Sequence, residues 1–210
     1  MTVTGYSDRI NHALAFAAKH HDRQVRKGTR LPFRTHAANV AIILTRYGQD
    51  EETIIAGILH DFVEDSIRER FTREMLEQRL ADKFGLAVID TLLSVVERTQ
   101  DDDGIELSHD ERKDDYLARL GNASDRARWV CAASQVHEGS TILSELRRTI
   151  EPESVWSRFH WGKDGTIRWY RRVHERLAEV GFAGAIMSEL GHVVTVLERH
   201  EASGASSARL

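Results

Sequence analysis

Four ionisable side chains end an otherwise apolar segment of the sequence, Gly57-Ile-Leu-His-Asp-Phe-Val-Glu-Asp65. On a helix, His60 and Glu64 lie one turn apart and share a face, and Asp61 and Asp65 share the neighbouring face by the same spacing. Such groups beside a hydrophobic core are costly to bury unless they are paired or bind a metal ion. Adjacent His and Asp supply a nitrogen and an oxygen ligand, which suits Mn²⁺, Fe²⁺ or Zn²⁺ better than Ca²⁺. The segment predicts a metal site, with a solvated helix end as the alternative for Glu64 and Asp65.

His36 is a second candidate ligand. It lies in the segment Leu31–Ala41, at the first turn of a predicted helix and next to small residues that let helices approach closely. A single histidine at such a position is more often structural than a ligand, so its assignment depends on the order of the surrounding motifs.

The elements that must position these residues are helices, because apolar residues recur mostly at spacings of three and four. We expect them over about 7–22, 35–47, 50–65, 72–84, 86–97, 108–120, from 124 past 137, from 152, 165–180 and 183–200. Ser7 is a predicted N-cap, Gly48 a stop signal, and Ser108 with Glu111 a capping box. The predicted fold class is all-α, with about eight to ten helices in one domain over 1–200. A small polar tail, 201–210, is expected to be disordered.

The composition excludes several classes of protein. A formal net charge of −4 over 210 residues excludes a generally basic nucleic-acid-binding protein, and the single cysteine, Cys131, excludes a disulfide framework or a cysteine-rich zinc site. The sequence contains no apolar leader and no run of about 18 apolar residues. We therefore expect a cytoplasmic protein with no nucleic-acid or membrane partner, and the oligomeric state stays open.

Several motifs follow one another in a fixed order. They are Ala13–His21, Gln24-Val-Arg-Lys-Gly28, Pro32-Phe-Arg-Thr-His36, Ala56–Ser66, Asp110–Arg119, Val155–Gly165 and Trp169-Tyr-Arg171. Over roughly residues 8–180 this order resembles the HD-domain (p)ppGpp hydrolases, which comprise RelA/SpoT-type hydrolase domains and free-standing small alarmone hydrolases. The resemblance implies an HD-domain helical bundle.

The resemblance also implies a role for each residue of the metal site. His36, His60 and Asp61 correspond to metal ligands, usually of Mn²⁺ in this family, although another divalent transition metal is possible. Glu64 and Asp65 correspond to the residues that orient or deprotonate the attacking water. A divalent ion that lowers the pKa of water beside a carboxylate is physically consistent with these roles.

Four residues are candidates for binding the substrate. Arg26 and Lys27 correspond to residues that contact the nucleotide and its phosphates in the family. Lys113 and Tyr170 match the family less closely and are candidates for contacts to a phosphate and to the base. Cationic side chains near the metal suit a substrate with several phosphates. The implied partner is a small-molecule nucleotide, (p)ppGpp or a relative of it, that loses its 3′-diphosphate by hydrolysis.

The sequence departs from the family at the fourth metal ligand. The family motif is Lys-x-Ala-Asp-x-x-x-Asn, whereas this chain has Cys131-Ala-Ala-Ser-Gln-Val-His-Glu138, so that Ser134 replaces the Asp. A neutral hydroxyl is a poor substitute for a carboxylate on a divalent metal. Glu138 lies one turn after Ser134 and is our predicted replacement ligand, directly or through water. His137 is a less favoured substitute, and three ligands with water are a further possibility.

Two other functions stay open at this point. The loss of the Asp at Ser134 is also consistent with a degenerate HD domain that binds a nucleotide or a protein partner without catalysis. A different HD activity, such as that of a nucleotidase or phosphodiesterase, is the third hypothesis.

Overall fold

The computed structural model describes residues 6–21, 24–25, 32, 34–69 and 71–207. Ten helices lie within these ranges: α1 (Asp8–His20), α2 (Arg34–Arg46), α3 (Glu51–Arg68), α4 (Arg73–Phe84), α5 (Leu86–Val95), α6 (His109–Asn122), α7 (Asp125–Arg148), α8 (Glu153–Trp156), α9 (Gly162–Glu179) and α10 (Ile186–Ser207). The described residues form isolated β-bridges, as between Gln100 and Glu106, but no β-strand. The prediction of an all-α fold is confirmed.

The ends of the helices follow from local sequence signals. The Ser7 side chain accepts a hydrogen bond from the backbone N–H of Ile10 at 3.1 Å and so caps α1. Ser108 and Glu111 form the predicted capping box at the start of α6. Gly48, two residues after the end of α2, has a φ of 68°, a left-handed conformation that stops the helix and that glycine adopts without strain.

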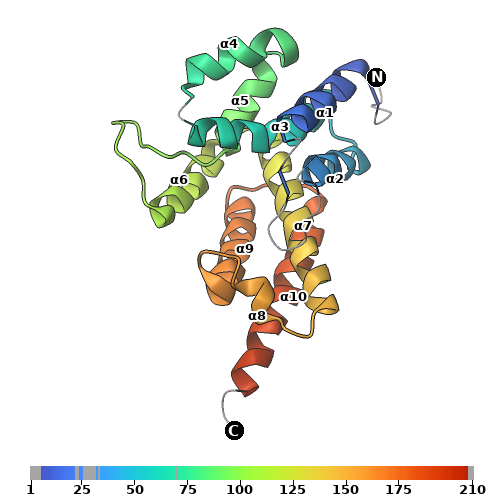
Figure 1. Ribbon diagram of the computed structural model, residues 1–210, viewed down its shortest axis with the longest axis vertical. Coiled ribbons are helices and arrows are strands. Elements are labelled where there is room, and N and C mark those ends of the chain that lie inside the picture. Colours follow the sequence, from blue (N-terminus) through green and yellow to red (C-terminus); the bar gives the residue numbers. More distant parts are fainter. Residues whose placement is uncertain (1–5, 22–23, 26–31, 33, 70, 208–210) are drawn as a thin grey trace.

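Helix α7 links the two halves of the molecule. It packs against α2, α3 and α5 in one half and against α8, α9 and α10 in the other (Figure 1). Much of helix α3 is enclosed in the first half, where Ile55, Leu59 and Phe62 are all fully buried. A helix that is apolar on most sides must lie inside the fold, and α3 therefore places the ionisable residues of its second half between other helices.

A glycine allows α2 and α3 to approach each other closely. A Cβ atom at Gly57 would lie 2.5 Å from Leu44 Cδ1 and 3.0 Å from Val40 Cγ1, both on α2. Because interiors are packed without spare volume, a side chain at this position would push the helices apart. Gly57 thus keeps His36 on α2 within reach of His60 on α3.

The C-terminal part of the chain differs from the expectation. Helix α10 begins at Ile186 and continues to Ser207, so that 201–207 are helical where we expected a disordered tail, and 208–210 lie outside the described residues. Extending an existing helix requires no new nucleation step. None of the described helices has the length and hydropathy that crossing a membrane requires. The single domain over 1–200 stays a prediction.

Candidate metal centre

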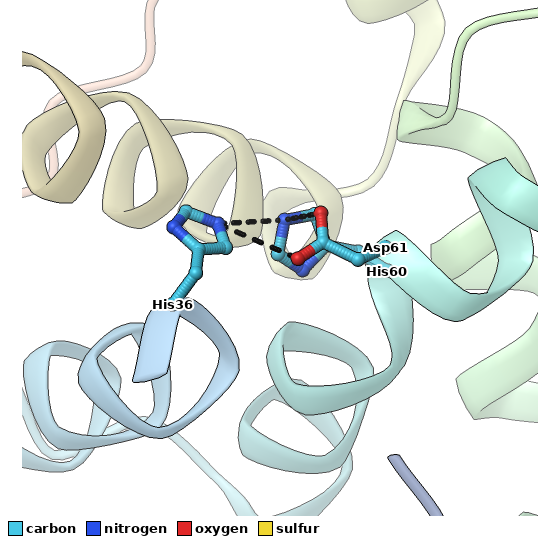
Figure 2. A group of neighbouring side chains, drawn as sticks. All are labelled: His36, His60 and Asp61. Atoms are coloured by element: carbon cyan, nitrogen blue, oxygen red, sulfur yellow. Dashed lines mark hydrogen bonds and ion pairs between the residues drawn. The ribbon is translucent and has the colours of Figure 1, made fainter. Parts of the chain in front are cut away.

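Three predicted ligands meet where the first turn of α2 faces the middle of α3. His36, His60 and Asp61 each offer a ligand atom, and these atoms all lie within 4.8 Å of one another (Figure 2). The two histidine Nε2 atoms are 3.1 Å apart, and His60 Nε2 is 3.2 Å from Asp61 Oδ1. His36 is 2% exposed and His60 7% exposed. The structure therefore brings together two nitrogens and a carboxylate in a site that is largely shielded from water.

The polar atoms of this cluster fit a divalent cation. Asp61 Oδ2 is buried and has no hydrogen-bond partner among the described residues, a costly arrangement for a carboxylate oxygen that nothing else neutralises. His60 Nδ1 lies 2.8 Å from the carbonyl oxygen of Gly57. Since a carbonyl only accepts hydrogen bonds, Nδ1 carries the hydrogen and Nε2 keeps its lone pair for a metal. The N, N, O donor set is that of a transition-metal site.

The position of the missing family ligand also lies at the cluster. Ser134 Oγ is 3.3 Å from His36 Nε2, so the face of α7 that the sequence analysis selected does point at the metal site. Glu138 is not one of the three clustered residues, although it lines the space next to Asp61. Its role as a ligand stays a prediction. Burial raises the pKa of the Cys131 thiol to about 12, so in the absence of a metal ion this residue is a neutral thiol at pH 7.

A cavity of about 310 Å³, the Lys113 cavity, adjoins the cluster. Residues of α3, α6, α7 and α9 line it, among them Asp61, Glu64, Asp65, Lys113, Ser134 and Trp169. Its volume is at the lower end of the range found for small-molecule sites. The Lys113 ammonium lies 2.5 Å from Glu97 Oε2 and 4.7 Å from the centroid of the Trp169 ring. A predicted phosphate-binding cation and the predicted catalytic carboxylates thus share one cavity.

Arg68 is a residue of this cavity that the sequence analysis did not select. Its guanidinium forms an ion pair with Glu64 and lies 3.6 Å from Asp65 Oδ1. The spacing of four residues from Glu64 would have placed it on the same helix face. Burial, opposed by Arg68, raises the pKa of Glu64 above its usual value. A carboxylate with a raised pKa is a better proton acceptor near neutral pH.

A second cavity of about 420 Å³, the Tyr170 cavity, adjoins the other side of the cluster. Its lining includes His36, Asp61, Arg68, Glu138, Arg158 and Tyr170. Tyr170 is 3% exposed. Three residues, Asp61, Arg68 and Glu138, line both cavities, so the cluster is accessible from two sides. The remaining predicted substrate contacts, Arg26 and Lys27, lie outside the described residues.

Comparison with known proteins identifies the family of the chain. The HD domain family matches residues 13–158 of the 210-residue chain. A guanosine-3′,5′-bis(diphosphate) 3′-pyrophosphohydrolase of Aquifex aeolicus is 43% identical over 72 residues, covering 31% of this chain and 10% of that protein. A GTP pyrophosphokinase of Myxococcus xanthus is 29% identical over 113 residues, covering 54% of this chain and 14% of that protein. The chain thus spans only a small part of these relatives.

Two solved structures resemble the chain along most of its length. A metazoan orthologue of SpoT, reported to hydrolyse ppGpp and to play a role in starvation responses, superposes with a TM-score of 0.67 at 24% identity, covering 91% of this chain and 96% of its own. A Listeria monocytogenes protein superposes with a TM-score of 0.63 at 26% identity, covering 77% of this chain and 97% of its own. The arrangement of the helices is therefore one that other proteins share.

Proposed function

The chain belongs to the HD domain family, and on that premise we propose that it is a metal-dependent phosphohydrolase that removes the 3′-diphosphate of (p)ppGpp or a related nucleotide. One observation carries the proposal: the buried His36–His60–Asp61 cluster lies beside Glu64 and borders two cavities. The similarity to a 3′-pyrophosphohydrolase supports this substrate class. The cytoplasm is the proposed location.

The proposed cofactor is Mn²⁺, held by His36, His60 and Asp61 and, in this proposal, by Glu138 directly or through water. When bound, a divalent cation supplies Lewis acidity and lowers the pKa of nearby water. Asp61 Oδ2 has no hydrogen-bond partner among the described residues, and His60 Nε2 has a lone pair directed at the cluster, which supports the assignment of these two ligands.

Glu64 is the proposed proton acceptor. Its raised pKa and its place in the Lys113 cavity support this role. In this proposal Asp65 helps to orient the attacking water, which loses a proton to Glu64 while its oxygen forms a bond to the 3′-linked phosphorus. The bond between that phosphorus and the 3′ oxygen breaks, and the 3′ oxygen takes up the proton held by Glu64. The products are pyrophosphate and a nucleotide with a free 3′ hydroxyl.

The cationic residues recognise the phosphates in this proposal. Lys113 lies in the cavity that contains Glu64, where its ammonium can exchange Glu97 for a phosphate oxygen. Arg26 and Lys27 are proposed to contact the nucleotide, and Tyr170 the base, as the family resemblance implies.

One observation favours a second candidate function. Ser134 contributes a neutral oxygen where the family motif has a carboxylate, which weakens any metal site. The second candidate is therefore a degenerate HD domain that binds a nucleotide or a protein partner without catalysis. It predicts that the purified protein contains no transition metal and that ligand binding is insensitive to a chelator.

A comparison of three variants tests the leading proposal. We expect His60→Ala to lose both bound metal and turnover of ppGpp in Mn²⁺. Glu64→Gln should retain the metal but lose at least about 100-fold in turnover, because only the proton acceptor is removed. Asp90→Asn, which alters an exposed ion pair with Arg73, is the matched control and should leave both properties unchanged. Full activity of either His60→Ala or Glu64→Gln would contradict the proposal.

A further inference from the structure

A third histidine, His137, contacts the ring nitrogen of His36 that does not face His60 and Asp61. His137 on α7 places its Nδ1 2.7 Å from His36 Nδ1, and the two ring centroids are 4.7 Å apart with the planes inclined at 63°. This is hydrogen-bond distance for two ring nitrogens. Only one of the two nitrogens can carry the hydrogen that joins them.

The geometry of the cluster determines which nitrogen that is. His36 Nε2 is the atom that faces His60 Nε2 and Asp61, so a metal at the cluster binds His36 through Nε2. A neutral imidazole that ligates through one nitrogen carries its hydrogen on the other. His36 Nδ1–H must then donate, and His137 Nδ1 must accept.

We propose that His137 is a positioning residue for the metal site: it accepts the hydrogen bond of His36 Nδ1–H and thereby fixes His36 in the tautomer and orientation that present Nε2 to the cation. This inference rests on the metal site of the proposed function. It gives the two ligand histidines equivalent supports, because the Gly57 carbonyl accepts from His60 Nδ1 in the same way. Such supports behind ligand histidines raise metal affinity.

The departure at Ser134 makes this support more consequential in this chain. Ser134 and His137 lie three residues apart on α7, so both face His36, one at each ring nitrogen. If the hydrogen moved to His36 Nε2, that nitrogen would donate to His60 Nε2 or to the Ser134 hydroxyl and could not bind a metal. An acceptor at His137 Nδ1 favours the Nδ1–H tautomer instead. With no carboxylate at position 134, the orientation of each remaining ligand matters more to the metal affinity.

Metal affinity in a pair of substitutions tests the proposal. The Oδ1 atom of His137→Asn lies close to the place of the lost Nδ1 and can still accept, whereas His137→Leu fills similar space without an acceptor. We expect His137→Leu to bind Mn²⁺ about tenfold or more weakly than the wild type, and His137→Asn to recover most of the loss. His192→Leu, on an exposed position of α10, is the matched control.

The proposal would be overturned if His137→Leu and the wild type bound Mn²⁺ with equal affinity. It would also be overturned if His137→Asn and His137→Leu lost Mn²⁺ affinity equally, because a change in packing alone would explain equal losses. The protein used is the full chain, and thermal unfolding of the metal-free variants checks that each is folded. Because the titration contains no nucleotide, a failure of the proposed hydrolysis does not alter its outcome. A wild type that binds no metal would overturn this proposal together with the metal site.

The tautomer itself is the second readout. Two-bond ¹H–¹⁵N spectra of the protein loaded with Zn²⁺, a diamagnetic substitute for Mn²⁺, distinguish the protonated ring nitrogen of His36 from the metal-bound one. We expect His36 to carry its hydrogen on Nδ1, and this hydrogen to exchange with water faster in His137→Leu, which has no acceptor for it. A His36 protonated at Nε2 in the Zn²⁺-loaded wild type would refute the assignment.

Discussion

Ser134 brings a neutral hydroxyl to 3.3 Å from His36 Nε2, where the family motif has an Asp. The three clustered ligands, His36, His60 and Asp61, supply a single negative charge to a divalent ion. An Asp at position 134 would add a further negative charge beside the ion, whether or not Glu138 also reaches it. At this range, a further carboxylate is worth several kcal/mol in the partly shielded environment of a protein.

We predict that Ser134→Asp strengthens Mn²⁺ binding at least about tenfold, a modest part of that electrostatic term. Ser134→Asn has the same size and no charge, so it serves as the control and should bind no more tightly than the wild type. Competition titration against a chelating dye gives both constants. Equal affinities of the Asp and Asn variants would show that residue 134 does not face the metal.

Glu64 makes a second prediction at this scale. Burial, although opposed by Arg68, raises the pKa of Glu64 in the fold, so its ionised form is less favourable in the folded than in the unfolded chain. The free energy of unfolding of the wild type therefore falls as the pH rises through the raised pKa of Glu64. Glu64→Gln has no ionisable group at this position, so its free energy of unfolding does not fall for this reason. The metal-free variant should unfold at a higher temperature than the wild type at pH 8, and the two should converge below the ordinary Glu pKa of about 4.3.

Thermal unfolding of the metal-free proteins between pH 4 and pH 8 measures this difference directly. A wild type that is more stable than Glu64→Gln at pH 8 would mean that the ion pair with Arg68 outweighs the cost of burial. The carboxylate would then be stabilised in its ionised form, which is unfavourable for a proton acceptor.

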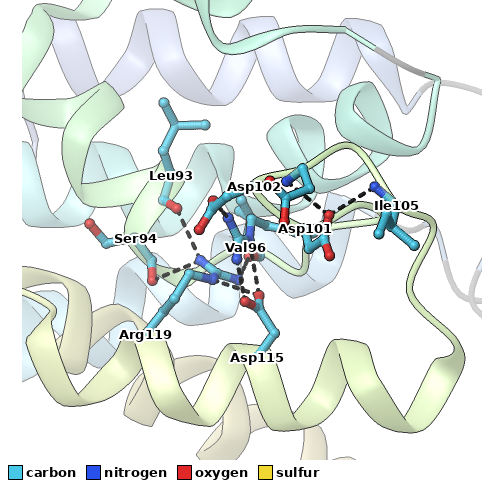
Figure 3. A network of polar contacts seen from close by, with 10 residues as sticks. Leu93, Ser94, Val96, Asp101, Asp102, Ile105, Asp115 and Arg119 are labelled. Carbon is cyan, nitrogen blue, oxygen red and sulfur yellow. Dashed lines mark hydrogen bonds and ion pairs between the residues drawn. The ribbon is translucent and has the colours of Figure 1, made fainter.

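At the scale of elements, a polar network joins the end of α5 to α6. Arg119 donates to the carbonyl oxygens of Leu93, Ser94 and Val96 and to Asp115 (Figure 3). Asp115 also accepts from Arg98. This junction holds Glu97 opposite Lys113, and it therefore fixes one wall of the Lys113 cavity.

We predict that Arg119→Ala lowers the free energy of unfolding by about 2–3 kcal/mol, because it leaves three carbonyl groups without this donor and removes one of the two arginines that bind Asp115. Arg126→Ala is the control. The Arg126 side chain is 41% exposed and forms ion pairs with Asp50 and Glu52, so the loss of these pairs should lower the free energy of unfolding by no more than about 1 kcal/mol. Urea unfolding gives both values. An equal cost for both substitutions would show that the α5–α6 junction contributes no more than a surface ion pair.

The helices themselves could be predicted from the sequence, because their ends depend on neighbouring residues. Ser7, Ser108 and Glu111 cap their helices as predicted. The Arg119 network could not be predicted, since it joins side chains to carbonyl groups about 25 residues away whose positions depend on how α5 packs against α6. The extension of α10 beyond residue 200 does not follow from the sequence, because the composition of this segment is that of a polar tail.

The site was predictable to a similar degree. The spacing within α3 and the order of the motifs indicated His36, His60 and Asp61, which the structure groups together. The sequence favours Glu138 over His137 as the residue near the cluster, because spacing along one helix relates Glu138 to Ser134 but does not show how α7 is rotated against α2. That rotation places the ring of His137 on His36.

At the scale of the whole molecule, a metal ion at the cluster joins elements that are distant in sequence. His36 lies on α2 and His60 and Asp61 on α3, while His137 on α7 supports His36. A ligand that binds only the folded state stabilises it by mass action, by about 2.7 kcal/mol at a concentration of 100 times the Kd. For a chain of this size we predict that saturating Mn²⁺ raises the Tm by about 5–10 °C.

Differential scanning fluorimetry with Mn²⁺ and with a chelator measures this shift. His60→Ala should unfold at the same temperature in both conditions, because it lacks a ligand. A wild type whose Tm does not change would exclude stabilisation by a bound metal. A change in Tm that persists in His60→Ala would show that the stabilising metal binds elsewhere.

The most direct test of the central claim is the release of pyrophosphate from ppGpp by the purified wild-type protein, measured with Mn²⁺ and with a chelator. The account predicts one pyrophosphate for each ppGpp consumed in the presence of Mn²⁺ and none with the chelator. Turnover that continues in the chelator, or no turnover by protein with metal bound at the cluster, would contradict it.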